Sequence, residues 1–384
     1  MLLEPTPDQE FLKETTAKFL TSQASVAEIR RLRDDPIGFD RDYWRRGADL
    51  GWTSLLVPEA LGGGSVSGRG LIDLTLIAHE FGRHAAPGPL VPTNVVAAAL
   101  AASAVGPSAP SVSTEHSDVI GALLSGRATA SWCMEETGGF GRMTTEARRD
   151  GQEVVLSGTK RPAESAAQAD FLLVTAKTGE GATQVLIPSG TPGVSVRPMQ
   201  TVDLTRRFAV ATFDEVRLPI AAVVGEVGSA SEEVEHQLRV AQVILNAETV
   251  GAMERAFEMT VEWAFDRYSF GRPLASYQEL KHRFADMKTW LESSHAIADA
   301  SAEAVAAKAP DAGLLISVAK AFIGHYGGEL IQDCVQIHGG IGLTFEHDLH
   351  LFLRRATLNS SLFGTPADHR QRISTITIAE ECAG

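Results

Sequence analysis

The first part of the chain carries apolar residues at helical spacing. The predicted helices cover residues 9–25, 39–50, 70–81 and 95–105. Gly51 and Pro58 interrupt the pattern between the second and third of them, because glycine and proline end helices. We therefore predict an all-helical N-terminal domain over residues 1–125.

The hydrophobic period changes to two at about residue 127. Short alternating or β-branched runs follow, for example at 153–160 and 209–216, and Gly, Pro, Asp and Ser separate them. This spacing is typical of an antiparallel sandwich or barrel. We predict a middle β domain over residues 126–228.

The last part of the chain is helical again. Long helices are predicted over residues 234–268, 276–307, 313–337 and 348–362. Short connections between long helices favour an antiparallel four-helix bundle, here over residues 229–384. The fold class is therefore α+β with three domains in the order α, β, α. A dinucleotide-binding fold is disfavoured, because no glycine-rich turn joins a strand to a helix.

Charge and composition narrow the function classes. The 384 residues carry a net charge of −14, so a nucleic-acid backbone is an improbable partner. No uninterrupted apolar run reaches the roughly 18–20 residues of a membrane span. Acidic residues near the N-terminus stand where a signal peptide needs bases, which predicts a cytoplasmic protein.

Cysteine and histidine positions give no sign of a metal site. The three cysteines are far apart and form no CxxC pair, and the eleven histidines form no HExxH motif. Five histidines fall in helical patterns, where we expect surface or packing roles. They are His79, His84, His236, His282 and His295.

Two segments of the C-terminal part could bind a nucleotide. In D-R-Y-S-F-G-R-P (266–273), Arg267 ends a predicted helix, and Q-I-H-G-G-I-G (336–342) contains three glycines. Either segment can be read as a helix cap or a tight turn. Either can also bind a pyrophosphate, since arginine makes paired hydrogen bonds and glycine lets backbone approach a ligand.

These segments, in this order, resemble the flavin-dependent acyl-CoA dehydrogenases. Further matches are W-R-R-x4-L-G-W (44–52), V-P-E-A-L-G-G (57–63), H-E-F-G-R (79–83) and A-E-x-x-G-A-x-E-R-A (247–256). The resemblance covers most of the chain. It implies a dimer of dimers, with an extended FAD between two subunits and electron-transfer flavoprotein as electron acceptor.

The resemblance also implies roles for individual residues. Arg267 would meet the FAD pyrophosphate, and Phe270 and Gln278 would lie beside it. The adenine half would contact Gln336, Gly339 and Gly340, and Thr365 would contact FAD near the C-terminal turn. The implied reaction is α,β-desaturation of an acyl-CoA thioester, in which a carboxylate removes the α proton and the flavin takes the β hydrogen as hydride.

The family's two positions for the catalytic glutamate are not filled by acids. They fall on Phe363, before Gly364-Thr365, and on Ala241 in the first bundle helix. Glu248 is a candidate substitute base, although a packing or salt-bridge role suits it better. Glu235 and Asp368 are weaker candidates.

The segments that face the flavin ring in the family also differ here. Thr-Glu-Pro-Gly is replaced by Glu135-Glu136-Thr137-Gly138, and Trp-Ile-Thr by Pro162-Ala163-Glu164. An acid beside the reduced, anionic flavin would oppose its reduction unless it points away. Three hypotheses remain: an active dehydrogenase, a non-catalytic subunit that completes a partner's FAD site, and a flavin-free binding or scaffold protein of the same fold.

Overall fold

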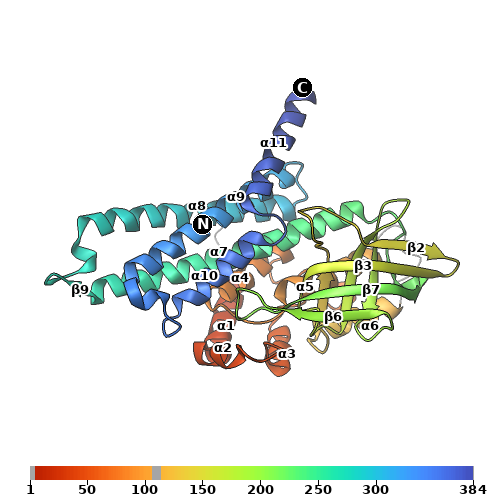
Figure 1. Cartoon of the computed structure of the whole chain (residues 1–384), viewed down its shortest axis with the longest axis horizontal. Coiled ribbons are helices and arrows are strands. Elements are labelled where there is room, and N and C mark those ends of the chain that lie inside the picture. Colours follow the sequence, from red (N-terminus) through yellow and green to blue (C-terminus); the bar gives the residue numbers. More distant parts are fainter. Residues whose placement is uncertain (1–4, 106–113, 384) are drawn as a thin grey trace.

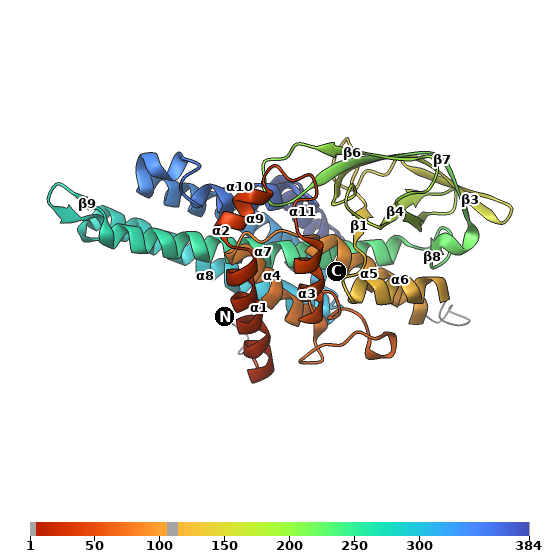
Figure 2. The same cartoon turned by 90° about the horizontal axis from the view of Figure 1, so that it is seen from below.

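The computed structural model describes residues 5–105 and 114–383. The predicted order of helical, β and helical parts is confirmed (Figure 1). The sheet lies at one end of the molecule, and the long helices extend from it to the other end. The N-terminal helices cover one side of the long helices, as the rotated view in Figure 2 shows.

The N-terminal part contains more helices than the hydrophobic pattern predicts. They are α1 (Pro7–Gln23), α2 (Val26–Leu32), α3 (Arg41–Asp49), α4 (Gly70–Arg83), α5 (Leu90–Val105) and α6 (Thr114–Leu124), with a 3-10 turn at Glu59–Leu61. The helix α2 was not predicted, because its 7 residues are too few to show a period. Ser25 caps it by accepting a hydrogen bond from the Glu28 amide. Trp44 and Trp52 are fully buried where α3 meets α4.

The middle part forms a mixed sheet. Its strands are β1 (Ala130–Cys133), β2 (Glu146–Asp150), β3 (Glu153–Glu164), β4 (Phe171–Lys177), β5 (Ala182–Pro188), β6 (Val194–Met199), β7 (Phe208–Pro219) and β8 (Val223–Val224). The strand order is β6-β7-β3-β2-β4-β5-β8. The purely antiparallel arrangement that the sequence predicts is wrong, since both β1 and β2 pair with β4 in parallel. The antiparallel β2–β3 hairpin lies between β1 and β4 in the chain.

The C-terminal part is built from the long helices that the pattern predicts, followed by a further helix. They are α7 (Ser231–Asp266), α8 (Gln278–Ala306), α9 (Ala312–His338), α10 (Leu349–Ser361) and α11 (Pro366–Ala383). The small hairpin of β9 (Tyr268–Ser269) and β10 (Arg272–Pro273) joins α7 to α8. By length and composition the stretch Ala312–Leu343 could cross a membrane, but α9 packs among α7, α8, α10 and α11, as the core helix of a bundle does.

Two glycines allow α4 and α7 to touch along their backbones. A Cβ atom on Gly82 would lie 1.8 Å from the carbonyl oxygen of Glu248, and one on Gly251 would lie 2.0 Å from that of His79. Neither backbone oxygen can move without separating the helices. Both glycines belong to motifs that carry the family resemblance, so these motifs also encode the contact between the N-terminal helices and the bundle.

We expect Gly251→Ala to lower the free energy of unfolding by about 1–3 kcal/mol, because the added methyl group forces the two helices apart. Urea denaturation measures the change. Gly328→Ala in α9 is the matched control, since a Cβ there meets nothing within 4 Å. Gly328→Ala should leave the free energy of unfolding unchanged or raise it by up to about 1 kcal/mol, because alanine favours a helix more than glycine does. Equal effects of the two substitutions would contradict the proposed close contact.

Candidate functional site

The turn between α10 and α11 lines a pocket at the sheet end of the bundle. The pocket has a volume of ≈ 220 Å³, and its lining includes Glu135, Phe140, Leu238, Phe363 and Thr365. This volume is below the range of roughly 300–1,000 Å³ that is usual for small-molecule sites. The predicted site residues Phe363 and Thr365 therefore do border a pocket, but a small one.

The backbone conformation, an aromatic contact and polar contacts of the carbonyl fix Phe363 in this turn. Its backbone has φ 54° and Gly364 has φ 97°, both in the left-handed region. The phenyl ring is buried against Trp132, with ring centroids 5.3 Å apart. Its carbonyl accepts a hydrogen bond from Gln242 Nε2 at 2.9 Å and contacts His369 Nε2 at 3.0 Å. A side chain that cannot accept a proton thus occupies the position where the resemblance predicts a base.

Glu135 places a buried carboxylate beside this turn. Its Oε1 accepts a hydrogen bond from the Phe363 amide at 3.1 Å. Burial raises the pKa of Glu135 to about 7, although this hydrogen bond and the charge of Lys320 act in the opposite direction. Burial also lowers the pKa of Lys320 to about 7. The Lys320 ammonium donates to the carbonyls of Asn359 at 2.7 Å and Leu362 at 2.9 Å.

Glu136 points into the middle domain and pairs with another residue of the sheet. Lys160 Nζ lies 2.6 Å from its Oε1, and the amide of Thr145 donates to the same oxygen at 3.0 Å. Burial acts to raise the pKa of Glu136, but the bonds from Lys160 and Thr144 outweigh it and lower the pKa to about 2. Both adjacent acids line the pocket, but they differ in their partners: Glu136 forms a buried ion pair with Lys160, and Glu135 accepts a hydrogen bond from the Phe363 amide.

Glu248, the candidate substitute base, lies in a buried ion network. Its Oε1 pairs with Arg355. Its Oε2 is 3.2 Å from Arg206 Nη1 and accepts a hydrogen bond from Asn359 Nδ2 at 2.8 Å. Both carboxylate oxygens are thus occupied by donors within the protein, and neither faces the pocket beside Phe363.

The same network contains Glu164, at the position where the resemblance predicts a flavin-contacting threonine. Arg206 binds the Glu164 carboxylate with two nitrogens, Nε at 2.7 Å and Nη2 closer. Burial raises the pKa of Glu164, with the Arg206 charge opposing the shift. Arg355 extends the network to Asp203, at 2.6 Å, and to the carbonyl of Ala86 in the N-terminal part.

The other predicted site residues lie together at the opposite end of the bundle. Arg267 stacks over the Trp263 ring at 5.8 Å, and Trp263 stacks on His338 with ring centroids 5.1 Å apart. This stack joins the β9–β10 hairpin to the turn after α9. The hairpin lies at the end of the bundle far from the sheet (Figure 1).

This end of the bundle presents exposed groups. Phe270 is 98% exposed. Gln278, Gln336, Gly339 and Gly340 are also exposed. A Cβ on either glycine would meet nothing within 4 Å, so the packing of this chain does not require glycine there. Among the described residues no carboxylate pairs with Arg267, which leaves its guanidinium available to a ligand.

The predicted residues thus form two separate groups. Thr365, Phe363 and Ala241 lie near the sheet, whereas Arg267 and its neighbours lie at the far end. Thr365 caps α11, and its hydroxyl donates to Asp368 Oδ2 at 2.6 Å. Sequence reasoning missed Arg206 and Arg355, because isolated arginines in a loop and a helix carry no motif.

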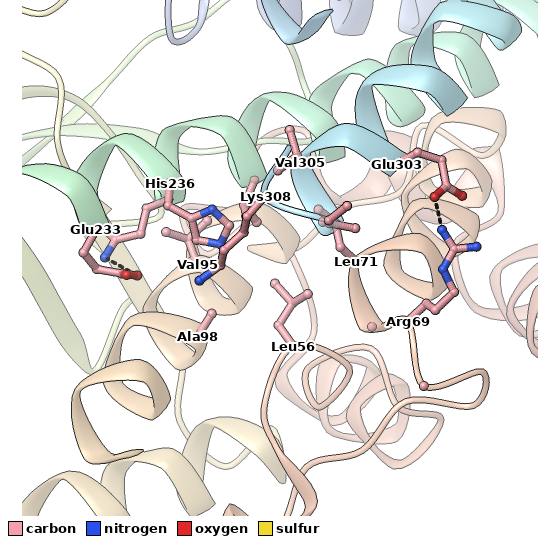
Figure 3. Close-up of a pocket in the computed structure, with 16 residues that line it drawn as sticks. Leu56, Arg69, Leu71, Val95, Ala98, Glu233, His236, Glu303, Val305 and Lys308 are labelled. Atoms are coloured by element: carbon pink, nitrogen blue, oxygen red, sulfur yellow. Dashed lines mark hydrogen bonds and ion pairs between the residues drawn. The ribbon is translucent and has the colours of Figure 1, made fainter. Parts of the chain in front are cut away.

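A larger pocket on another side of α7 contains none of these residues. Its volume is ≈ 340 Å³, and its lining includes Leu56, Leu71, His236 and Lys308 (Figure 3). An ion pair between Arg69 and Glu303 lies at one end. Size alone therefore does not locate the site that the motifs indicate.

The fold and the two groups of residues define a class of protein. Models of the acyl-CoA dehydrogenase N-terminal, middle and C-terminal domains match residues 6–105, 134–214 and 209–376. The chain belongs to the acyl-CoA dehydrogenase family, an oxidoreductase family whose members bind FAD, and the resemblance seen in the sequence is confirmed.

Individual relatives extend over the whole chain. Acyl-CoA dehydrogenase IpdE2 of Mycobacterium tuberculosis is 28% identical and covers 97% of this chain and 98% of its own length. The solved structure of a variant of the Tcur3481-Tcur3483 steroid ACAD is 28% identical, with a TM-score of 0.86, over 98% of this chain and 99% of its own. Butyryl-CoA dehydrogenase from Megasphaera elsdenii shares the fold, with a TM-score of 0.86 at 20% identity over 98% of this chain and 100% of its own.

The two groups of residues differ in how well they suit FAD. At the far end, an unpaired guanidinium, two amide side chains and bare glycine backbone fit a pyrophosphate and an adenine. At the sheet end, the small pocket, the buried Phe363 and the carboxylate of Glu135 do not fit a flavin ring that becomes anionic on reduction.

We expect Glu248→Gln to lower the free energy of unfolding by about 3–5 kcal/mol, because it removes the buried charged partner that Arg206 and Arg355 share. Chemical denaturation, monitored by circular dichroism, measures the change in the free energy of unfolding. Glu262→Gln, on the exposed side of the same helix, is the control and should change stability by less than about 0.5 kcal/mol. A Glu248→Gln protein as stable as the control would show that the network does not hold the fold.

Proposed function

We propose that this chain is a non-catalytic subunit of a hetero-oligomeric acyl-CoA dehydrogenase. The observation that carries the proposal is the split between its two groups of residues. The predicted nucleotide-binding residues are exposed, but neither position where the resemblance predicts the base holds an acid. Phe363 is buried in an aromatic contact, and Ala241 is fully buried.

In this proposal the exposed end of the bundle completes the FAD site of a related subunit. Arg267 neutralises the pyrophosphate, and the amides of Gln278 and Gln336 bind the adenine half. Phe270, which is almost fully exposed in its own chain, covers the cofactor or the partner surface. When bound, FAD accepts the two electrons of the desaturation. The partner supplies the base and the flavin-ring site.

The relatives support this assignment and suggest a substrate class. The Tcur3481-Tcur3483 structure carries a paired name and is described as a steroid enzyme, and it is 28% identical to this chain. We infer that the assembled enzyme desaturates the acyl-CoA thioester of a steroid or another lipid in the cytoplasm and passes its electrons to an electron-transfer flavoprotein. The protein described here contributes cofactor binding and not proton abstraction.

The proposal predicts the colour of the purified protein. Alone, the chain should be colourless and inactive towards acyl-CoA substrates. Co-purified with a related subunit that has a glutamate at a base position, the complex should be yellow and should bleach with substrate. Absorption spectra of both preparations measure this. A yellow, active preparation of this chain alone would contradict the proposal, and so would a colourless complex, which would favour a scaffold role.

Arg267→Ala tests the predicted contact with the pyrophosphate. In the hetero-oligomer it should weaken FAD retention by about 10-fold or more, because it removes a charge-assisted pair worth about 1.5–3 kcal/mol. Flavin absorbance per complex after gel filtration measures retention. Arg197→Ala removes an exposed arginine from β6 and should leave flavin content unchanged. Full occupancy in the Arg267→Ala complex would contradict the role of this residue.

A self-sufficient dehydrogenase is the second candidate function, and Glu135 favours it. Its carboxylate lines the pocket beside Phe363, and its pKa is about 7. A general base works best with a pKa near the pH of the reaction. In this candidate the base would come from the middle domain and not from the C-terminal turn.

The second candidate predicts a pH dependence for any activity of this chain alone. The rate of flavin reduction by substrate should rise as the pH increases through about 7, because the carboxylate of Glu135 must lose its proton. Glu135→Gln should abolish flavin reduction by substrate, and Glu146→Gln on the exposed face of β2 should leave it unchanged. Stopped-flow spectroscopy measures the rate. An unchanged rate in Glu135→Gln would eliminate this carboxylate as the base.

A further inference from the structure

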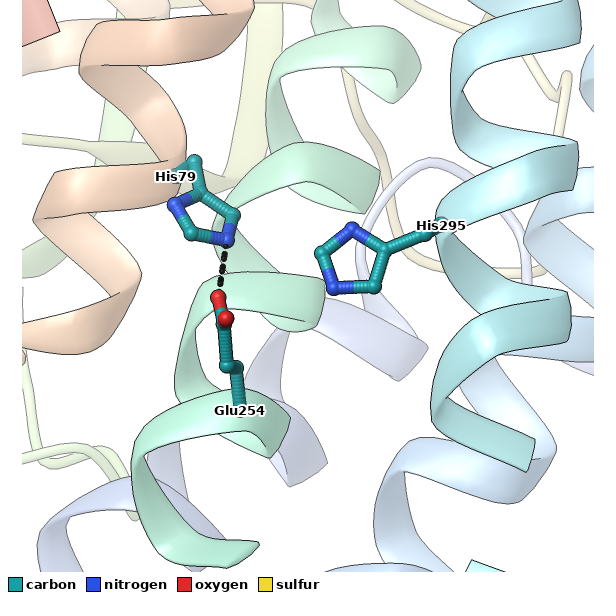
Figure 4. A group of neighbouring side chains, drawn as sticks. All are labelled: His79, Glu254 and His295. Atoms are coloured by element: carbon teal, nitrogen blue, oxygen red, sulfur yellow. Dashed lines mark ion pairs between the residues drawn. The ribbon is translucent and has the colours of Figure 1, made fainter. Parts of the chain in front are cut away.

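Three helices bring two histidines and a glutamate together on a side of the bundle that the FAD proposal does not use. His79 belongs to α4, Glu254 to α7 and His295 to α8 (Figure 4). One ligand atom from each side chain lies within 4.8 Å of the others. His79 Nε2 is 2.7 Å from Glu254 Oε2, and the two imidazole rings lie 5.8 Å apart, centroid to centroid.

The close pair of His79 and Glu254 is incomplete as a hydrogen bond. The carboxylate oxygen is near the ring nitrogen, but the buried Nε2 atom has no hydrogen-bond partner in good alignment. A buried polar atom without a partner is uncommon in a folded protein and calls for a ligand or a role. The side chains of His79, Glu254 and His295 point toward one another across the space between the three helices (Figure 4).

The residues around His79 resemble the outer shell of a metal site. Its other nitrogen, Nδ1, lies 3.4 Å from Glu80 Oε1, and Glu80 is buried. A carboxylate behind a ligating histidine orients the ring and makes it a stronger ligand. Arg83, which approaches Glu254 at 3.2 Å, is also bound by both oxygens of Glu258, so its charge stays paired if Glu254 turns towards an ion.

A cavity of ≈ 220 Å³ adjoins the three side chains and offers room for water. Its other charged lining residues are Lys13, Glu292 and Asp299, and Glu292 is paired with Lys288 at 2.6 Å.

We propose that His79, Glu254 and His295 bind a divalent transition-metal ion, with Zn²⁺ as the best match. Two imidazole nitrogens and one carboxylate are a known ligand set for Zn²⁺, and water from the cavity would fill the fourth position. The ion takes the place of any proton on His79 Nε2. Mg²⁺ and Ca²⁺ are excluded as preferred ions, because they require oxygen ligands.

Such an ion would connect two parts of the fold. His79 lies in the N-terminal helices, whereas Glu254 and His295 lie in the bundle, so one ion would cross-link them beside the α4–α7 contact. The sequence pattern predicts packing roles for His79 and His295. The sequence contains no metal motif for this site, because each ligand comes from a different helix. Only folding brings the three side chains together.

The test uses the full-length chain after treatment with a chelator and buffer exchange. Isothermal titration with Zn²⁺ should give one ion per chain, Zn²⁺ should raise the melting temperature, and Co²⁺ should give the visible absorption of a four- or five-coordinate site. Mg²⁺ at the same concentration should neither bind nor raise the melting temperature. His295→Gln should weaken Zn²⁺ binding by about 100-fold or more, since removing a ligand costs more than the about 10–100-fold of an outer-shell change.

His236→Gln in α7, which borders the larger pocket, is the matched control and should bind Zn²⁺ as the unmodified protein does. Glu254→Gln provides a second variant on a different helix, and circular dichroism verifies that each variant is folded. The proposal would be overturned if the unmodified chain bound no Zn²⁺, or if His295→Gln and His236→Gln bound Zn²⁺ equally well. These outcomes do not depend on flavin content or activity, so they leave the proposed subunit role to its own tests.

Discussion

The arrangement of the three parts of this protein depends on one buried ion network. Arg206 and Asp203 come from the loop between β6 and β7, Glu164 from β3, Glu248 from α7 and Arg355 from α10. Arg355 also reaches the carbonyl of Ala86 in the N-terminal part. Removing so many charges from water costs several kcal/mol for each ion, and good geometry must offset it. The network therefore permits few relative positions of sheet, bundle and N-terminal helices.

This network also shapes the sheet end of the bundle. Glu164 and Glu248 are bound to arginines within the chain, and Phe363 packs against Trp132 beside the C-terminal turn. Glu135 lines the pocket with its carboxylate hydrogen-bonded to the Phe363 amide. At the other end of the bundle, no carboxylate of the described residues pairs with Arg267. The predicted base positions and the predicted nucleotide-binding residues thus lie at opposite ends of the same helices.

Several features could be read from local sequence because they arise from local physics. The change of hydrophobic period from helical to alternating marks where the sheet begins, and the long apolar repeats predict α7, α8 and α9. The absence of an acid at Phe363 and Ala241 is visible in the letters themselves. Short elements were harder to predict: α2 has too few residues to show a period, and the parallel pairing of β1 with β4 depends on the whole path of the chain between them.

The sequence by itself determined the family, the order of helical and β parts, and the positions that lack a base, since each of these rests on residues close together in the chain. The tertiary structure alone decided how the charged residues are used. It directed Glu248 and Glu164 to buried arginines, turned Glu135 towards the C-terminal turn, and brought His79, Glu254 and His295 together from three helices. The reason is that a carboxylate or imidazole acquires its role from the groups around it, and in this fold those groups come from distant segments.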